Sequence, residues 1–205
     1  MASGGELGQT NSSHNSKITS NSLEVKPFPN KKSISWELPP SKSHAIRTLF
    51  LASQSSGSTE IFGISNSGHD VNSMKNCLIQ LGVKMEKLDN HGNVSPLGIE
   101  LIGSDISSII VHGVGKNGFK KPKNRLDIGN SGTTLRLISI LCSRFDFEVI
   151  IDGDMSIRSR YTKSLWNSMV DSGVSVSYLQ DEFHLPVKIH GPWFSQGQNK
   201  TLLLD

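Results

Sequence analysis

The sequence has few cysteines, few aromatic residues and no long apolar segment, and each shortage excludes a class of protein. Its two cysteines, Cys77 and Cys142, lie in helix-like apolar patterns, which predicts reduced thiols in an intracellular protein core and no disulfide framework. Aromatic residues are 6% of the chain, and 21 basic against 18 acidic residues give a net charge of +3. A nucleic-acid-binding protein usually has a strong excess of basic residues, which this chain does not have. No apolar run approaches the length of a membrane span. We therefore predict neither a nucleic-acid nor a membrane partner.

Metal-binding patterns are also missing. No pair of cysteines or histidines has the spacing of a metal site, and the seven histidines are dispersed along the chain. We therefore predict no metal and no cofactor.

Residues 1–30 are rich in Ser, Asn and Gly and have no hydrophobic period, which predicts a disordered tail. The serine content would suit a plastid transit peptide, but this stretch has no arginine and contains Glu6 and Glu24. We expect a cytoplasmic protein, with a plastid location as the alternative.

Residues 31–205 are predicted to form an α/β (α+β) domain in which one supersecondary unit, strand-helix-strand-helix-strand-strand, is used twice. Glycines mark the repeat, because Gly63, Gly82 and Gly103 are followed about 90 residues later by Gly153, Gly173 and Gly191. The expected helices are residues 43–53, 70–81, 131–142 and 160–172. The expected strands are residues 34–38, 58–62, 83–88, 99–102, 125–128, 147–151, 174–179 and 185–189.

The last residues of the chain predict the beginning of a third copy. Thr201–Asp205 reads as a strand with no helix after it, and such a strand cannot bury its apolar face well. We therefore divide the domain into unit one (about 34–103), unit two (about 124–191) and the start of unit three (201–205). A fragment or a truncated gene product would have this pattern.

The first chemically informative stretch runs from Pro40 to Arg47. Its prolines exclude a helix before Ser41, and Ser41 or Ser43 can cap the helix that follows. The start of a helix attracts anions, and Arg47 lies one turn after Ser43 on the same side. Together with Lys42, these residues predict a site for a doubly charged anion. The plainer alternative is a capped helix with two solvated cations.

Two further motifs follow at larger numbers: Gly129-Asn130-Ser131-Gly132-Thr133-Thr134-Leu135-Arg136 and Gly153-Asp154-Met155-Ser156-Ile157-Arg158-Ser159-Arg160. With the first stretch and in this order, they resemble the N-terminal half of the 3-phosphoshikimate 1-carboxyvinyltransferase (EPSP synthase) family, from about Ile34 to the end of the chain. The resemblance implies attack of the 5-hydroxyl of shikimate 3-phosphate on C2 of phosphoenolpyruvate, protonation of C3 and release of phosphate. Both substrates are polyanions, and such a reaction needs a preorganised cationic cradle.

The resemblance also assigns roles to individual residues. Lys42 matches the lysine between the two substrates, and Ser43 and Arg47 match shikimate 3-phosphate ligands. Gly132 and Arg160 match the phosphoenolpyruvate pocket.

Three other residues are possible supporting ones. Asn130 can cap a helix, Arg136 is either a site residue or a surface ion-pair partner, and Asp70 is either near the cleft or a helix cap, which we favour. Family members usually have a proline directly after the arginine that matches Arg160, whereas this chain has Tyr161. The direction of the Arg160 side chain therefore stays open. Arg158 is a second candidate for that role.

The resemblance leaves the chemistry incomplete. The proton-transfer carboxylates of the family have no match here, so we assign no catalytic residue and expect a need for the C-terminal half. One alternative is a relative of UDP-N-acetylglucosamine enolpyruvyl transferase, which has Lys-Asn at the first site. RNA 3′-phosphate cyclase shares the repeated unit, but its histidine pattern is absent. A non-catalytic anion-binding half-domain is the remaining alternative.

Overall fold

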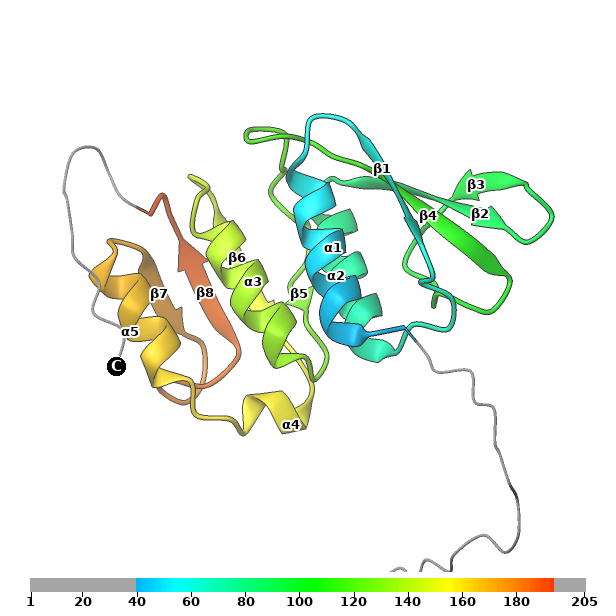
Figure 1. Cartoon of the computed structure of the whole chain (residues 1–205). Helices are drawn as coiled ribbons and strands as arrows, with labels where there is room; N and C mark the ends of the chain where they lie inside the picture. Colours follow the sequence, from blue (N-terminus) through cyan, green and yellow to red (C-terminus); the bar gives the residue numbers. More distant parts are fainter. Residues whose placement is uncertain (1–39, 194–205) are drawn as a thin grey trace, which may run out of the picture. The chain divides into compact units, whose positions relative to one another are not determined.

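The computed structural model describes residues 40–193, all of which belong to one structural unit. The predicted tail (1–30), the strand at residues 34–38 and the start of unit three (201–205) lie outside the described residues. Helices and strands are mixed along the chain (Figure 1), in the order α1 (Lys42–Gln54), β1 (Ser58–Phe62), α2 (His69–Gln80), β2 (Lys84–Asp89), β3 (Val94–Pro96), β4 (Ile106–His112), β5 (Leu126–Asp127), α3 (Gly132–Cys142), β6 (Glu148–Asp152), α4 (Met155–Arg158), α5 (Lys163–Asp171), β7 (Ser175–Tyr178) and β8 (Val187–His190).

The strands form two four-stranded sheets with the same arrangement at their centre. The first sheet has the order β1-β4-β2-β3, and all of its pairs are antiparallel. The second has the order β5-β6-β8-β7, in which only β5 and β6 are parallel. The series β1-β4-β2 therefore corresponds to β6-β8-β7. This result confirms the mixed α/β class, with two sheets within residues 40–193.

Helices cover one side of each sheet because apolar residues recur at helical spacing. α1 packs against α2, α3 and the first sheet, whereas α3 packs against β6 and β8 (Figure 1). The buried apolar side chains of both units form one continuous cluster. Cys77 and Cys142 are buried in this cluster with free thiols, as their apolar patterns predicted. Burial raises the pKa of both thiols well above the ordinary value.

The prediction was wrong in the last part of unit one. Residues 99–102 are not a strand: the final strand is β4, Ile106–His112, and the short strand β3 lies where no strand was expected. The backbone at 98–102 bonds to side chains of α2 instead of to a strand. The ammonium of Lys75 donates to the carbonyls of Gly98 and Glu100, and the Asn72 side-chain oxygen accepts the Ile102 amide at 3.0 Å.

The position of β4 also corrects one of the glycine pairs. Gly103 precedes β4, whereas Gly113 follows it as Gly191 follows β8. A Cβ on Gly113 would lie 2.6 Å from the Ala52 carbonyl, and one on Gly191 would lie 2.7 Å from the Phe145 carbonyl. Gly113 is therefore the counterpart of Gly191, and the repeat in unit one extends beyond residue 103.

The helix predicted at 160–172 was also wrong at its start. The expected loop at 153–159 contains α4, and α5 begins only at Lys163. Thr162 is the N-cap of α5, and its backbone amide donates to the Phe183 carbonyl at 3.2 Å. This contact with a distant turn determines where α5 begins. No local pattern in the sequence indicates the contact.

Candidate functional site

The first predicted anion site lies at the beginning of α1. Ser41 is the N-cap, but its side chain makes no capping hydrogen bond, so the capping role predicted for Ser41 or Ser43 was wrong. Arg47 folds back over the first turn, where its Nη1 donates to the Ser43 carbonyl at 3.0 Å and also to the Ser43 hydroxyl. Lys42, Ser43 and Arg47 are all exposed. The predicted placement of Ser43 and Arg47 on one side of the helix is therefore correct.

Asp70 has a different structural role from the cap that the sequence favoured. It lies in the first turn of α2, whose N-cap is Gly68. Its carboxylate pairs with the Lys42 ammonium at 2.8 Å, with 64% of the lysine side chain exposed and 24% of the aspartate. Such a partly exposed pair stabilises the fold by at most about 1 kcal/mol. Its main consequence is positional, because Asp70 holds the Lys42 ammonium beside the start of α2.

The second motif forms the beginning of α3. Ser131 is the N-cap, and its hydroxyl accepts the Thr134 amide at 3.2 Å, so Asn130 does not cap this helix as predicted. The Asn130 side-chain oxygen instead accepts a hydrogen bond from Nη2 of Arg160 at 2.5 Å. The guanidinium of Arg160 is therefore directed to the start of α3.

Gly132 leaves space for two guanidinium groups. A Cβ at this position would lie 3.1 Å from Nη1 of Arg136 and 3.4 Å from Nη1 of Arg160. Arg136 donates to the Gly132 carbonyl at 2.9 Å, which places it beside Arg160 and decides against a surface ion pair within residues 40–193. Gly132, Asn130, Arg136 and Arg160 therefore form one cluster, which we call the α3 cluster.

The α3 cluster adjoins the residues at the start of α1 through Asp70. The Thr134 hydroxyl donates to the Asp70 carbonyl at 3.4 Å, while the Asp70 carboxylate binds Lys42. The N-terminal ends of α1, α2 and α3 therefore meet in one region, where the three helix dipoles add positive potential. In the described part of the chain, Arg47, Arg136 and Arg160 have no ion-pair partner. The region is thus a concentration of uncompensated positive charge.

Arg158 lies two residues from Arg160 but points into the protein. Its Nε and Nη2 bind the two oxygens of Asp152 at 2.8 and 2.6 Å, and Arg125 adds a third contact at 3.0 Å. Burial by itself would raise the pKa of Asp152, but the hydrogen bonds from Arg158, the Gly153 amide and Arg125 outweigh it and lower the pKa. Arg158 is therefore structural. An acidic residue ending an apolar strand was the signal that could have indicated this pair.

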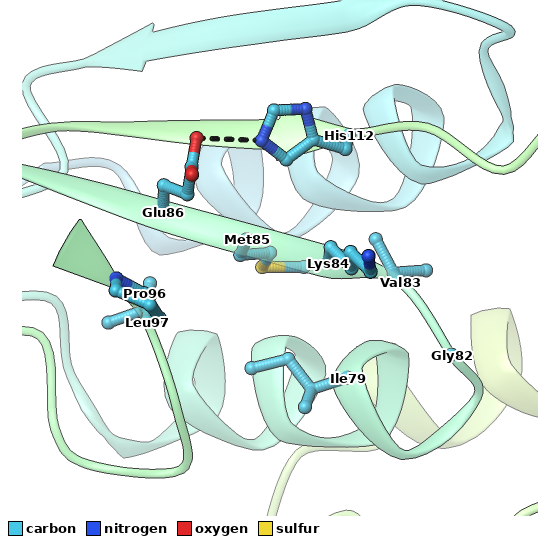
Figure 2. Close-up of a pocket in the computed structure, with 9 residues that line it drawn as sticks. All are labelled: Ile79, Gly82, Val83, Lys84, Met85, Glu86, Pro96, Leu97 and His112. Atoms are coloured by element: carbon cyan, nitrogen blue, oxygen red, sulfur yellow. Dashed lines mark hydrogen bonds and ion pairs between the residues drawn. The ribbon is translucent and has the colours of Figure 1, made fainter. Parts of the chain in front are cut away.

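A groove of about 630 Å³ lies elsewhere, at the C-terminal end of α2. Figure 2 shows Ile79 and Leu97 on one side of β2, with Glu86 and His112 on the other side and joined by a hydrogen bond of 2.8 Å. Asp70 is at the opposite end of α2. The groove is consequently separate from the anion region. Within residues 40–193 we find neither a group of side chains placed to bind a metal nor a helix long and apolar enough to cross a membrane.

Comparison with known proteins identifies the family to which these motifs belong. The family model of EPSP synthase (3-phosphoshikimate 1-carboxyvinyltransferase) matches residues 30–202. The chain belongs to the EPSP synthase family. A relative from Streptococcus thermophilus, named 3-phosphoshikimate 1-carboxyvinyltransferase, is 34% identical over 157 residues, which are 77% of this chain and 33% of the relative. A relative of the same name from Ruthia magnifica is 33% identical over 180 residues, or 88% of this chain and 37% of the relative.

Solved structures agree with this assignment. An EPSP synthase from Acinetobacter baumannii has a TM-score of 0.63 and 25% identity, with 77% of this chain and 32% of that chain covered. The chain therefore spans about a third of the length of the EPSP synthases that it matches. The binding roles of individual residues stay predictions.

Proposed function

We propose that this chain contributes the phosphate- and carboxylate-binding wall of an EPSP synthase active site. One observation carries the proposal: three helix N-termini and the side chains of Lys42, Arg47, Arg136 and Arg160 gather in one region, where Asp70 pairs with Lys42. Both substrates of the family reaction are polyanions, and positive charge that is already in place costs no reorganisation when they bind.

The two substrates divide between the two parts of the region. Lys42, Ser43 and Arg47 bind shikimate 3-phosphate, because the hydroxyl of Ser43 fixes orientation and the guanidinium of Arg47 can pair with a planar anion through two hydrogen bonds. Lys42, Gly132 and Arg160 bind phosphoenolpyruvate, and Arg136 and Asn130 support Arg160 from within the α3 cluster. Lys42 releases Asp70 or shares it when the anions arrive.

The chain is expected to bind substrates without turning them over. Asp70, the carboxylate that touches this region, is paired with Lys42, and we assign it no proton-transfer role. Catalysis also requires that water be excluded and the reacting atoms aligned. We propose that residues beyond the matched third of a synthase supply the opposite wall and the proton-transfer groups.

Isothermal titration of the 205-residue chain tests the binding roles. Arg47→Gln should weaken shikimate 3-phosphate binding at least tenfold with little effect on phosphoenolpyruvate, and Arg160→Gln should do the reverse, because each removes charged hydrogen bonds worth about 1.5–3 kcal/mol. Lys116→Gln removes an exposed charge elsewhere and serves as the control. Equal losses for all three variants would refute the division of the site.

Two further measurements separate this function from its alternatives. Steady phosphate release by the purified chain alone would show that this chain itself contains the groups needed for catalysis, contrary to the proposal. Release restored by adding a separately produced remainder of the Streptococcus thermophilus relative would support the proposal. Binding of UDP-N-acetylglucosamine in place of shikimate 3-phosphate would indicate the sugar-nucleotide transferase, and substrate binding without restored turnover would indicate an anion-binding module.

A further inference from the structure

The aromatic residue after Arg160 is anchored by a distant turn. The ring of Tyr161 meets the ring of Phe183 edge-on, with centroids 5.5 Å apart and an interplanar angle of 74°. The ring of His184 lies 5.7 Å from that of Tyr161. Phe183 and His184 belong to the connection between β7 and β8, far from Arg160 in sequence. Tyr161 therefore ties the arginine-bearing segment to a different part of unit two.

Phe183 also holds the two residues that follow Tyr161. Its carbonyl accepts the Thr162 amide at 3.2 Å and the Thr162 hydroxyl at 2.9 Å, and the Lys163 ammonium lies 5.2 Å from the centre of its ring. Tyr161, Thr162 and Lys163 thus all contact Phe183, through either its ring or its backbone carbonyl. Because Thr162 is the N-cap of α5, this contact also determines where that helix begins.

The conformation of Phe183 shows that its position is held by its neighbours. Its φ of +65° lies in the left-handed region, which is unfavourable for a bulky residue unless surrounding contacts maintain it. Tyr178 supplies one of these contacts, with ring centroids 5.3 Å apart. The turn is therefore a fixed support for Tyr161.

The segment is fixed on the other side of Arg160 as well. The Arg160 amide donates to the Ile157 carbonyl at 3.1 Å, and Arg158 is bound to the nearly buried Asp152. The backbone of Arg160 is thus restrained from both directions, while its guanidinium reaches Asn130 at the start of α3. A side chain in this situation loses little further freedom when it binds an anion.

We propose that Tyr161 and Phe183 are positioning residues that direct Arg160 toward Asn130 and Gly132. The proposal rests on the function proposed above, in which Arg160 binds phosphoenolpyruvate. Where family members usually have a proline that presets the backbone by its ring, this chain uses a tyrosine held by a second aromatic residue. In this proposal both rings act through Arg160 and are not themselves ligands of the substrate.

The test compares phosphoenolpyruvate binding by the 205-residue chain and five variants. Tyr161→Ala and Phe183→Leu should each weaken binding roughly fivefold, because an aromatic pair contributes a comparable factor. Tyr161→Phe keeps the ring and should bind like the parent. Shikimate 3-phosphate binding should be unchanged in all of them, because its proposed ligands lie on α1. Adding Tyr161→Ala to Arg160→Gln should cause no further loss, as expected for a residue that acts through Arg160.

A measurement without ligand tests whether Tyr161 positions Arg160 even where affinities are too weak to compare. The Nε–Hε nuclear magnetic resonance signal of the Arg160 side chain reports whether the guanidinium is held by Asn130. The signal should show a restrained guanidinium in the parent and in Tyr161→Phe. It should show a guanidinium averaged by motion in Tyr161→Ala and Asn130→Ala. A restrained signal in Tyr161→Ala would overturn this inference. Unchanged phosphoenolpyruvate binding in Arg160→Gln would instead overturn the role of Arg160 while leaving the positioning result intact.

Discussion

Unit one and unit two use one backbone plan but bury different side chains at corresponding places. Lys75 and Trp166 each lie about two turns before the positive-φ glycine that ends their helix, Gly82 or Gly173, and both side chains are fully buried. The Lys75 ammonium donates to the Gly98 and Glu100 carbonyls, whereas the Trp166 indole N–H has no partner among the described residues. Burial lowers the pKa of Lys75.

The last residue of the corresponding strands β1 and β6 shows the same contrast. β1 ends at Phe62 and β6 ends at Asp152, and each is followed by a glycine. Phe62 is 70% exposed, whereas Asp152 is 6% exposed and holds Arg158. Unit two has α4 after this strand, and Arg160 follows two residues after the end of α4. The backbone plan shared by the two units thus places corresponding residues, and insertions such as α4 or the 97–105 loop determine which groups those residues contact.

The largest expected effect separates Lys75 from Trp166. Trp166→Ala should lower the free energy of unfolding by about 4 kcal/mol, because it leaves a large cavity in the core. Trp166→Phe should cost only about 1 kcal/mol, since it keeps most of the apolar contact and removes an N–H that has no acceptor here. Lys75→Met should cost about 2 kcal/mol, because the Gly98 and Glu100 carbonyls lose their charged donor. Urea unfolding measures all three, and a Trp166→Phe loss as large as that of Trp166→Ala would contradict the account.

The next effect tests whether Gly113 and Gly191 are counterparts. Alanine at either position places a Cβ against backbone carbonyls at the end of the first helix of its unit. Such contacts cannot be relieved by moving a side chain, so we expect a loss of roughly 3 kcal/mol at both sites. Gly57→Ala is the control, because a Cβ there meets nothing within 4 Å. Melting temperatures that fall for only one of the two glycines would break the correspondence.

A smaller effect depends on pH and concerns Asp152. Asp152→Asn should cost about 2 kcal/mol at pH 7, because it removes the charge that neutralises Arg158 and Arg125, both partly exposed. The lowered pKa of Asp152 means that its contribution is present above the unfolded-state value of about 3.9 and is lost as pH falls through the folded-state value. The stability difference between parent and variant should therefore shrink below about pH 4. A difference that grows in acid would have the wrong sign.

The smallest effect compares the two helix starts that face the anion region. Ser131 caps α3 with its hydroxyl, whereas Ser41 makes no capping bond at α1. Ser131→Ala should therefore cost about 1 kcal/mol, and Ser41→Ala close to nothing. Chemical denaturation of the two variants side by side provides the measurement. Equal losses would mean that α1 is capped in solution as well.

The sequence by itself determined the features that depend on local periodicity. Helical spacing of apolar residues located α1, α2 and α3 to within a residue or two, and glycine marked the ends of α2 and α5 because a positive φ is required there. The spacing of Ser43 and Arg47 placed both on one side of α1, and three short motifs indicated the family. Apart from the family resemblance, which uses the order of the three motifs, these conclusions follow from neighbours within about two helical turns.

Only the tertiary structure decided which polar groups meet. The carbonyls of residues 98 and 100 became acceptors for Lys75, so a segment with the apolar pattern of a strand is a loop. Asp70 pairs with Lys42, and Phe183 holds Tyr161, Thr162 and thus the segment that carries Arg160. Such contacts join residues far apart in sequence, and their geometry follows from packing whole elements together. The local pattern therefore identifies the cations of the site, and the fold decides where they are directed.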